Sequence, residues 1–200
     1  DHPEIPLKVF ESATLDAGSP PGLYHGEVGH NGDPGSKTSA FGSIVGGGGA
    51  QVAMLKFCYV DVEEGQDPDS LFAAYQRDMA SLRARHPNLA LVHATMPLTG
   101  NGGRRGLLMA KLRGRPTAYD LNVIRNRYNA LLREAYVGKE PVFDLARLES
   151  TRSDGSRSYF IRGADTVYTL ASEYTNDGGH LNPAGRRLAA EAFLAVLATL

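Results

Sequence analysis

The apolar residues of this chain fall into short continuous runs that alternate with longer segments of helical spacing. The run at residues 51–60 is almost entirely apolar, which is typical of a parallel strand covered on both faces. Shorter apolar runs predict further strands at residues 7–12, 89–95 and 142–145. Apolar residues at helical spacing predict helices at residues 36–45, 71–82, 117–135 and 183–197.

Strands that alternate with helices indicate an α/β domain whose mainly parallel sheet lies between two helical layers, a three-layer α/β/α sandwich. Residues 13–35 are rich in glycine, proline and polar side chains and are expected to form a loop. Residues 150–176 are irregular apart from a predicted hairpin of 159–161 with 167–170. Neither an internal repeat nor a domain boundary is evident, so we expect residues 1–200 to form a single domain.

The composition is that of an ordinary globular domain, with 42% apolar and 22% charged residues in a chain of 200. The formal net charge is −1 and no basic cluster is interleaved with aromatic residues, so nothing indicates a nucleic-acid partner. No apolar stretch approaches the roughly 18 residues of a membrane-spanning helix. Cys58 is the single cysteine, and its apolar neighbours predict a buried, inert thiol.

The first residue of the chain bears on whether the chain has been processed. The first residue is Asp1 rather than methionine, and no signal peptide is recognisable. This start suggests a processed or trimmed chain, which slightly favours an extracytoplasmic location. A single cysteine leaves the redox compartment open.

An acid and an imidazole lie three residues apart in the turn at residues 177–182, Asp-Gly-Gly-His-Leu-Asn. Asn182 is a suitable N-cap and Pro183 suits the first helical position, so a helix fixes the end of the turn. The Asp177 carboxylate can accept from one ring nitrogen of His180, which leaves the other nitrogen free as a general base. The structural alternative is an ordinary glycine turn with a surface histidine.

Ligands of open α/β sheets bind at the carboxyl ends of the strands, an edge that the turn at 177–182 can also reach. A catalytic role for the acid and the histidine gains support from this convergence. The residues expected at the strand ends are Glu11, Ser12, Asp61, Thr95, Met96 and Asp144.

Two other kinds of site are disfavoured by the spacing of their residues. Residues 29–38 resemble a phosphate-binding loop only at their Lys-Thr end, because Asn31 and Ser36 stand where that loop needs glycine. The candidate metal ligands match no standard spacing; they are His25, His30 and Asp33. We therefore expect no nucleotide, no other cofactor and no metal.

Residues 96–116 form a long excursion with an excess of basic side chains. A solvated surface flap is one interpretation of this segment. The other is a segment that contacts substrate, which would favour an acidic or phosphorylated substrate. The basic residues are Arg104, Arg105, Lys111, Arg113 and Arg115.

The turn at 177–182 and the amphipathic helix after it resemble the last sequence block of the SGNH hydrolases, the GDSL-like esterase and lipase superfamily. Residues 52–62 with the following helix are similar to the strand, loop and helix that carry the third block. Residues 92–97 look like the next strand of that family. Residues 122–132 and 142–145 look like its penultimate helix and strand.

The resemblance implies a five-stranded parallel sheet in flavodoxin-like order. It also implies that His180 is a general base and Asp177 its orienting partner. Members of the family hydrolyse esters, often acetyl or acyl groups on carbohydrates or lipids, through a serine nucleophile and without a metal. A small-molecule or glycan ester is thus the expected partner.

Two departures from the family pattern concern the oxyanion and the nucleophile. Val60, followed by Asp61, stands where the third block of the family carries an asparagine that helps to hold the oxyanion. Asn31, the backbone of Gly32, and Asp61 are the candidates for oxyanion or substrate contacts here. No Gly-Asp-Ser-like block opens the chain, because residues 1–12 resemble the end of the first helix and the second strand. The nucleophile is therefore not identified.

Two hypotheses remain. In the first, which we favour because an oriented base without a use would be unusual, the protein is an SGNH-type esterase whose first strand and serine lie outside this chain. A preceding peptide or a second chain would then complete the sheet. In the second, the protein is a non-catalytic relative such as a carbohydrate-binding module. The first hypothesis predicts that residues 8–12 do not pair directly with residues 51–60.

Overall fold

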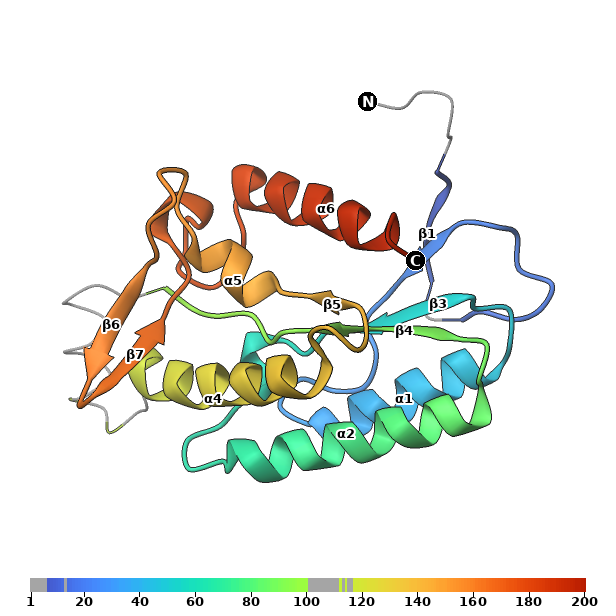
Figure 1. Ribbon diagram of the computed structural model, residues 1–200, viewed down its shortest axis with the longest axis horizontal. Coiled ribbons are helices and arrows are strands. Elements are labelled where there is room, and N and C mark those ends of the chain that lie inside the picture. Colours follow the sequence, from blue (N-terminus) through green and yellow to red (C-terminus); the bar gives the residue numbers. More distant parts are fainter. Residues whose placement is uncertain (1–6, 13, 101–111, 113, 115–116) are drawn as a thin grey trace.

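The computed structural model describes residues 7–12, 14–100, 112, 114 and 117–200. Its helices are α1 (Pro34–Gly46), α2 (Pro68–Arg85), α4 (Ala118–Tyr136), α5 (Leu145–Ser150) and α6 (Pro183–Leu197). Helices α1, α2 and α4 lie on one side of the central strands, and α5 and α6 lie on the other side (Figure 1). The predicted three-layer α/β/α arrangement is confirmed.

The central sheet is parallel. It contains β3 (Val52–Leu55), β4 (Ala90–Ala94) and β5 (Val142–Phe143), in that order. A separate parallel pair consists of β1 (Val9–Glu11) and β2 (Leu23–His25). The predicted hairpin is also present, as the antiparallel pair β6 (Tyr159–Arg162) and β7 (Asp165–Tyr168).

Side chains along β4 face the two helical layers in turn, because successive residues of a strand point to opposite faces. Leu91 packs in the core formed with α1, α2 and α4, which includes Tyr128. Val92 packs on the other face, with Phe143 and with Phe193 of α6. Both faces of the sheet are thus covered, which explains why the strand segments are apolar throughout.

Helix starts are determined by capping side chains. Asn182 accepts a hydrogen bond from the Gly185 N–H at 3.0 Å and Pro183 takes the first helical position, as predicted. Helix α1 starts before the predicted residue 36, because the Asp33 carboxylate accepts the Ser36 N–H at 3.0 Å and caps the helix. Aspartate is a favourable N-cap residue, and Pro34 after it suits the first helical position, so the helix begins earlier than its apolar residues indicate.

The strand predicted at residues 51–60 is wrong in its second half, since β3 ends at Leu55. The chain continues into the 3-10 helix η1 (Tyr59–Asp61). The carboxylate of Asp61 accepts the backbone N–H of Cys58 at 2.7 Å. Such a local bond competes with pairing to a neighbouring strand, so the apolar run does not continue as sheet.

Three short elements were not predicted. Strand β2 lies within residues 13–35, which were expected to be loop. Helix α5 begins where a strand was expected to end, because the Asp144 carboxylate accepts the Arg147 N–H at 3.1 Å and caps a helix. A second 3-10 helix, η2 (Ser172–Tyr174), lies before the turn at 177–180. All three are too short to show a hydrophobic period.

Residues 8–12 contribute to β1, which pairs with β2. In the described parts of the chain, β4 is the one strand that pairs with β3, and Val52 of β3 is 39% exposed. Direct pairing of residues 8–12 with 51–60 would have contradicted the predicted gap in the sheet, and it is not observed. An absent central strand therefore stays a prediction.

The basic excursion at residues 96–116 is described only in part. All five of its basic residues lie outside the described residues, so their influence on the substrate also stays a prediction. Among the helices that the structure does describe, none is long and apolar enough to cross a membrane.

Candidate active site

Both carboxylate oxygens of Asp177 accept hydrogen bonds within the turn at 177–180. Oδ1 accepts the backbone N–H groups of His180 and Gly179, each at 2.8 Å. Oδ2 lies 2.7 Å from Nδ1 of His180, which confirms the predicted side-chain hydrogen bond. The two backbone donors, and then the imidazole, hold the pKa of Asp177 well below its usual range. An ionised Asp177 keeps the imidazole proton on Nδ1, so Nε2 presents a free lone pair.

The two glycines of this turn have different tasks. Gly178 has a φ of +82°, a conformation that other residues rarely adopt. A Cβ at Gly179 would lie 3.0 Å from the hydroxyl oxygen of Tyr59, so glycine is needed there for close packing. The Gly100 N–H donates to the Gly178 carbonyl at 2.7 Å, which joins the turn to the segment after β4.

Nε2 of His180 faces Tyr59. Its distance to the Tyr59 hydroxyl oxygen is 3.4 Å, and the two rings meet edge to face with centroids 5.4 Å apart. Tyr59 belongs to η1, directly after β3, so His180 lies at the carboxyl edge of the sheet as predicted. The His180 side chain is 72% exposed, which leaves Nε2 accessible to a substrate.

A buried arginine fixes the backbone of Tyr59. Arg125 of α4 is 1% exposed and donates to the Tyr59 carbonyl from Nε at 3.2 Å and from Nη2 at 2.7 Å. Its Nη1 donates to Asn122 Oδ1 at 2.8 Å and to Thr99 Oγ1 at 3.0 Å. Burial lowers the pKa of Arg125 to about 10, so the guanidinium stays charged at neutral pH. Arg125 thereby connects the segments that follow β3 and β4.

Neither Tyr59 nor Arg125 was among the expected site residues. The sequence of α4 contains a pattern that could have identified the arginine: the polar residues Asn122, Arg125 and Asn129 follow one another at spacings of three and four residues. These three polar side chains are all buried. A polar stripe on the apolar face of a helix indicates buried side-chain hydrogen bonds, in this case to the loops after β3 and β4.

The expected oxyanion candidates form a cluster beside η1. Asp61 is fully buried and accepts from the Gly32 N–H at 3.0 Å and from Lys37 Nζ at 2.7 Å. Lys37 also donates to Asn31 Oδ1 at 2.8 Å. Two of these candidates are thus engaged within the protein: the Gly32 N–H donates to Asp61, and the buried Asp61 carboxylate is an acceptor that holds the loop. Asn31 is exposed and its side-chain amide keeps its two N–H donors.

The remaining strand-end candidates make structural contacts. Thr95 donates to Asp144 at 3.2 Å and accepts the Ala146 N–H at 2.9 Å, and Asp144 pairs with Arg133 at 2.7 Å. Met96 is fully buried. Glu11 is the exposed last residue of β1, and the Ser12 hydroxyl bonds with Thr14. Among the described residues, the side chains that lie within hydrogen-bond distance of the His180 ring are those of Asp177 and Tyr59.

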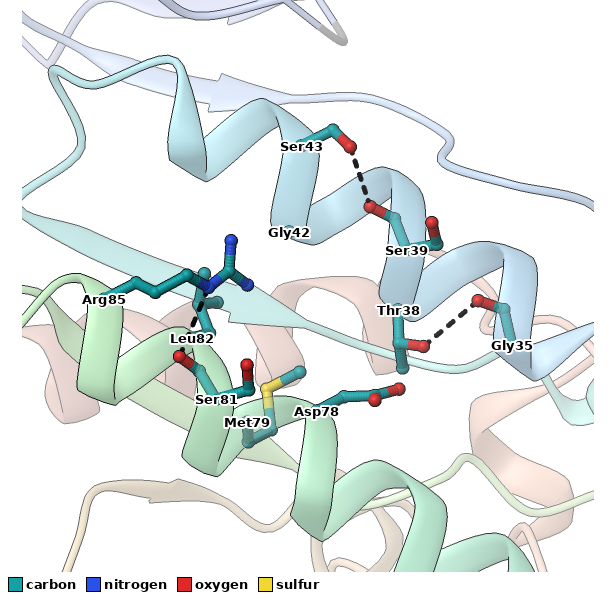
Figure 2. Close-up of a pocket in the computed structure, with 10 residues that line it drawn as sticks. All are labelled: Gly35, Thr38, Ser39, Gly42, Ser43, Asp78, Met79, Ser81, Leu82 and Arg85. Atoms are coloured by element: carbon teal, nitrogen blue, oxygen red, sulfur yellow. Dashed lines mark hydrogen bonds between the residues drawn. The ribbon is translucent and has the colours of Figure 1, made fainter.

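No serine within the described ranges forms a hydrogen bond with His180, so the nucleophile is not identified there. Ser39 lines a different hollow, the open groove between α1 and α2 (Figure 2). Its other lining residues include Gly42, Asp78 and Arg85, and none of them belongs to the site around His180. The groove and the candidate site are separate features.

The remaining residues for which the sequence made predictions are Cys58 and the candidate metal ligands. Cys58 is partly exposed rather than buried, because β3 ends at Leu55 and Cys58 lies in the segment that leads into η1. Within the described part of the chain, no three His, Cys, Asp or Glu side chains gather in a way that could hold a metal ion. His30 and Asp33 form an isolated bridge at the start of α1.

Several solved structures have a fold similar to that of this chain. A Streptococcus pneumonia protein described as a platelet activating factor has a TM-score of 0.60 at 15% identity, over 88% of this chain and 73% of that one. A Bacteroides fragilis protein described as an acylhydrolase has a TM-score of 0.56 at 16% identity, over 88% of this chain and 74% of that one. A Bacteroides thetaiotaomicron protein described as a GDSL-like lipase has a TM-score of 0.57 at 14% identity, over 89% of this chain and 76% of that one.

No protein-family model matches the chain, and no curated protein is significantly similar to it. The structural similarities nevertheless confirm the resemblance to the SGNH hydrolases at the level of the fold. The chain shares the α/β/α sandwich of these solved structures, and an Asp-x-x-His turn precedes its last helix.

Proposed function

We propose that this protein is a serine-type ester hydrolase in which His180 is the general base and Asp177 orients it. The observation that carries the proposal is the geometry of the pair. Nδ1 of His180 is bound to Asp177 at 2.7 Å, and Nε2 is accessible at the carboxyl end of β3. The fold shared with an acylhydrolase and a GDSL-like lipase supports ester hydrolysis as the reaction.

In the proposed reaction, Nε2 of His180 takes the proton of a serine hydroxyl while the serine oxygen attacks the ester carbonyl carbon. The tetrahedral intermediate then collapses, and His180 gives the proton to the departing alcohol. A water molecule repeats the sequence on the acyl-serine and releases the acid. Asp177 stabilises the imidazolium that forms in each half-reaction, because its carboxylate stays ionised beside Nδ1.

The serine belongs, in this proposal, to a strand of the same protein that precedes these residues and pairs with the free edge of β3. The carboxyl end of a parallel strand at that position would meet Tyr59 and His180 at one edge of the sheet. The exposure of Val52 supports a missing neighbour. So does α6, where Phe193 and Val196 are only partly buried.

We propose an acyl or acetyl ester, of a carbohydrate or a lipid, as the substrate. The descriptions of the similar structures support an acyl group, since they name an acylhydrolase and a lipase. A panel of acetylated sugars, short-chain esters and long-chain esters separates these classes.

The test uses the whole protein as its gene encodes it, assayed with p-nitrophenyl acetate. We expect His180→Ala to abolish hydrolysis nearly completely, and Asp177→Asn to lower kcat by about 10⁴-fold, as loss of the orienting acid does in serine proteases. His25→Ala is the matched control, because His25 is exposed on β2 and makes no contact with the site. Wild-type turnover in both site variants would show that the pair is structural, as in a carbohydrate-binding module.

A fluorophosphonate probe locates the nucleophile. We expect it to label one serine of the whole protein, outside residues 1–200, and to label no serine when residues 1–200 are expressed alone. Stoichiometric labelling of a serine within residues 1–200 that disappears in His180→Ala would place the nucleophile inside this chain. Labelling that requires mixing two chains would show that a second copy supplies the strand.

A further inference from the structure

The replacement of the family asparagine by Val60 leaves the proposed reaction without one donor for the oxyanion. The carbonyl oxygen becomes negatively charged as the serine attacks, and enzymes stabilise it with fixed hydrogen-bond donors. Gly32 is unavailable because its N–H donates to Asp61. The missing hydrogen-bond donor must therefore be another group that lies close to Nε2 of His180.

We propose that the Tyr59 hydroxyl is this donor, which makes Tyr59 a catalytic residue for the ester hydrolysis proposed above. Its oxygen lies 3.4 Å from Nε2 of His180. The serine oxygen must lie about 3 Å from the same nitrogen, with the substrate carbonyl next to it. A hydroxyl at this position is thus within reach of the developing oxyanion.

The contact with His180 is loose enough to be exchanged for a substrate. A separation of 3.4 Å is longer than a normal hydrogen bond to a hydroxyl, so little is lost when the hydroxyl turns toward another acceptor. Partial burial, and then the nearby Cys58 and Asp177, raise the pKa of Tyr59. The hydroxyl accordingly keeps its proton at neutral pH and can donate it in a hydrogen bond.

Tyr59 is also held in place on several sides, as an oxyanion donor must be. Arg125 makes two hydrogen bonds to its backbone carbonyl. Its hydroxyl and ring edge lie so close to Gly179 that a Cβ there would stand 3.0 Å from the hydroxyl oxygen and would force Tyr59 to shift. Asp61 closes η1 by accepting the Cys58 N–H. The hydroxyl is therefore directed before substrate arrives.

The step balances without proton transfer from tyrosine. The serine proton moves to Nε2, the new C–O bond forms, and the electron pair of the carbonyl π bond moves to oxygen. That oxygen accepts a hydrogen bond from Tyr59 until the tetrahedral intermediate collapses and the alcohol leaves with the proton of His180. Asn31 is the competing donor, but no contact joins it to His180 within the described residues, and its side-chain oxygen faces Lys37.

The test is Tyr59→Phe in the whole protein, with p-nitrophenyl acetate as substrate. We expect kcat to fall by about 10²–10³-fold with KM changed by less than about threefold, as for loss of one oxyanion donor. Tyr24→Phe is the matched control, because the Tyr24 hydroxyl donates to the Pro20 carbonyl at 2.8 Å and, among the described residues, makes no contact with the site. We expect it to retain wild-type kcat.

A role of Tyr59 in merely holding His180 predicts different behaviour. If Tyr59 only holds His180, Tyr59→Phe should shift the midpoint of the acid limb in a plot of kcat/KM against pH. If Tyr59 is an oxyanion donor, Tyr59→Phe should leave that midpoint in place and lower the plateau. Binding of an alkylboronic acid, which forms a tetrahedral adduct with serine, should weaken in Tyr59→Phe by a factor similar to the loss in kcat. A shifted midpoint with unchanged boronate binding overturns the proposal.

Gly179→Ala provides a second variant, because the new methyl group would displace the Tyr59 hydroxyl. We expect it to lower kcat in the wild type but to have little further effect in Tyr59→Phe. Equal losses in both backgrounds contradict the proposal.

The proposed function and the role of Tyr59 can fail separately. If His180→Ala is inactive while Tyr59→Phe keeps wild-type kcat, this inference fails and the proposed function stands. If His180→Ala is fully active, both fail.

Discussion

Replacing Arg125 by methionine is expected to lower the free energy of unfolding by about 3 kcal/mol. The guanidinium makes four hydrogen bonds, and two of them satisfy the Tyr59 carbonyl. Orphaning a buried carbonyl costs about 1–3 kcal/mol. The shorter side chain also loses packing, at about 0.8 kcal/mol per methylene. Relief from burying a charge opposes these terms and keeps the total near about 3 kcal/mol.

Thermal and urea unfolding measure this change. For a chain of this length a loss of about 3 kcal/mol corresponds to a decrease in Tm of roughly 6–12 °C. Arg125→Lys should lie between wild type and methionine, because an ammonium cannot make the paired contact with the Tyr59 carbonyl. Ester hydrolysis should fall in parallel, since Tyr59 loses its support.

Arg127→Ala is the control on the same helix. Arg127 is half-exposed and pairs with the half-exposed Asp69 at 2.6 Å, a surface contact of the kind that contributes little to stability. Its unfolding curve should match that of the wild type. A Tm of Arg125→Met within about 2 °C of the wild type, or an equal decrease in Arg127→Ala, would refute the assignment of Arg125 as the support of Tyr59.

Two further predictions concern stability. Burial raises the pKa of Glu149 to about 8, above the value of about 4.3 in an unfolded chain, so between these values the folded state holds a proton that the unfolded state has released. Stability should therefore fall as the pH rises from about 4.3 to 8, by up to about 1.4 kcal/mol per pH unit. In Glu149→Gln, which keeps the bond from the Leu98 N–H, this slope should disappear in urea titrations at several pH values, and an unchanged slope would contradict the assignment. Asp61→Asn breaks the buried pair with Lys37 and should cost about 3–5 kcal/mol in urea unfolding. Adding Lys37→Met should recover part of that loss, and a further loss of similar size would show that the two residues do not act as a pair.

Much of the layer architecture is determined locally and could be predicted. Apolar runs mark β4 and β5, and helical spacing marks α2, α4 and α6, because each element buries a face whose period is fixed by backbone geometry. The Asp177–His180 pair is local as well. Three residues of a glycine turn are enough to bring the carboxylate to Nδ1, so the sequence alone predicts the bond that the structure contains.

Residues joined across long sequence separations could not be predicted in the same way. Tyr59 and His180 are 121 positions apart, and Arg125 lies 66 positions from the carbonyl that it holds. The first contact exists because the segment after β4 binds the turn at 177–180, and the second because α4 packs in one core with β3 and β4. No local pattern specifies either arrangement. The same reason explains Asp61, whose type suggested a substrate contact at a strand end. Only the tertiary structure shows that its carboxylate is buried and accepts from Gly32 and Lys37, since hydrogen-bond partners follow from packing rather than from residue type.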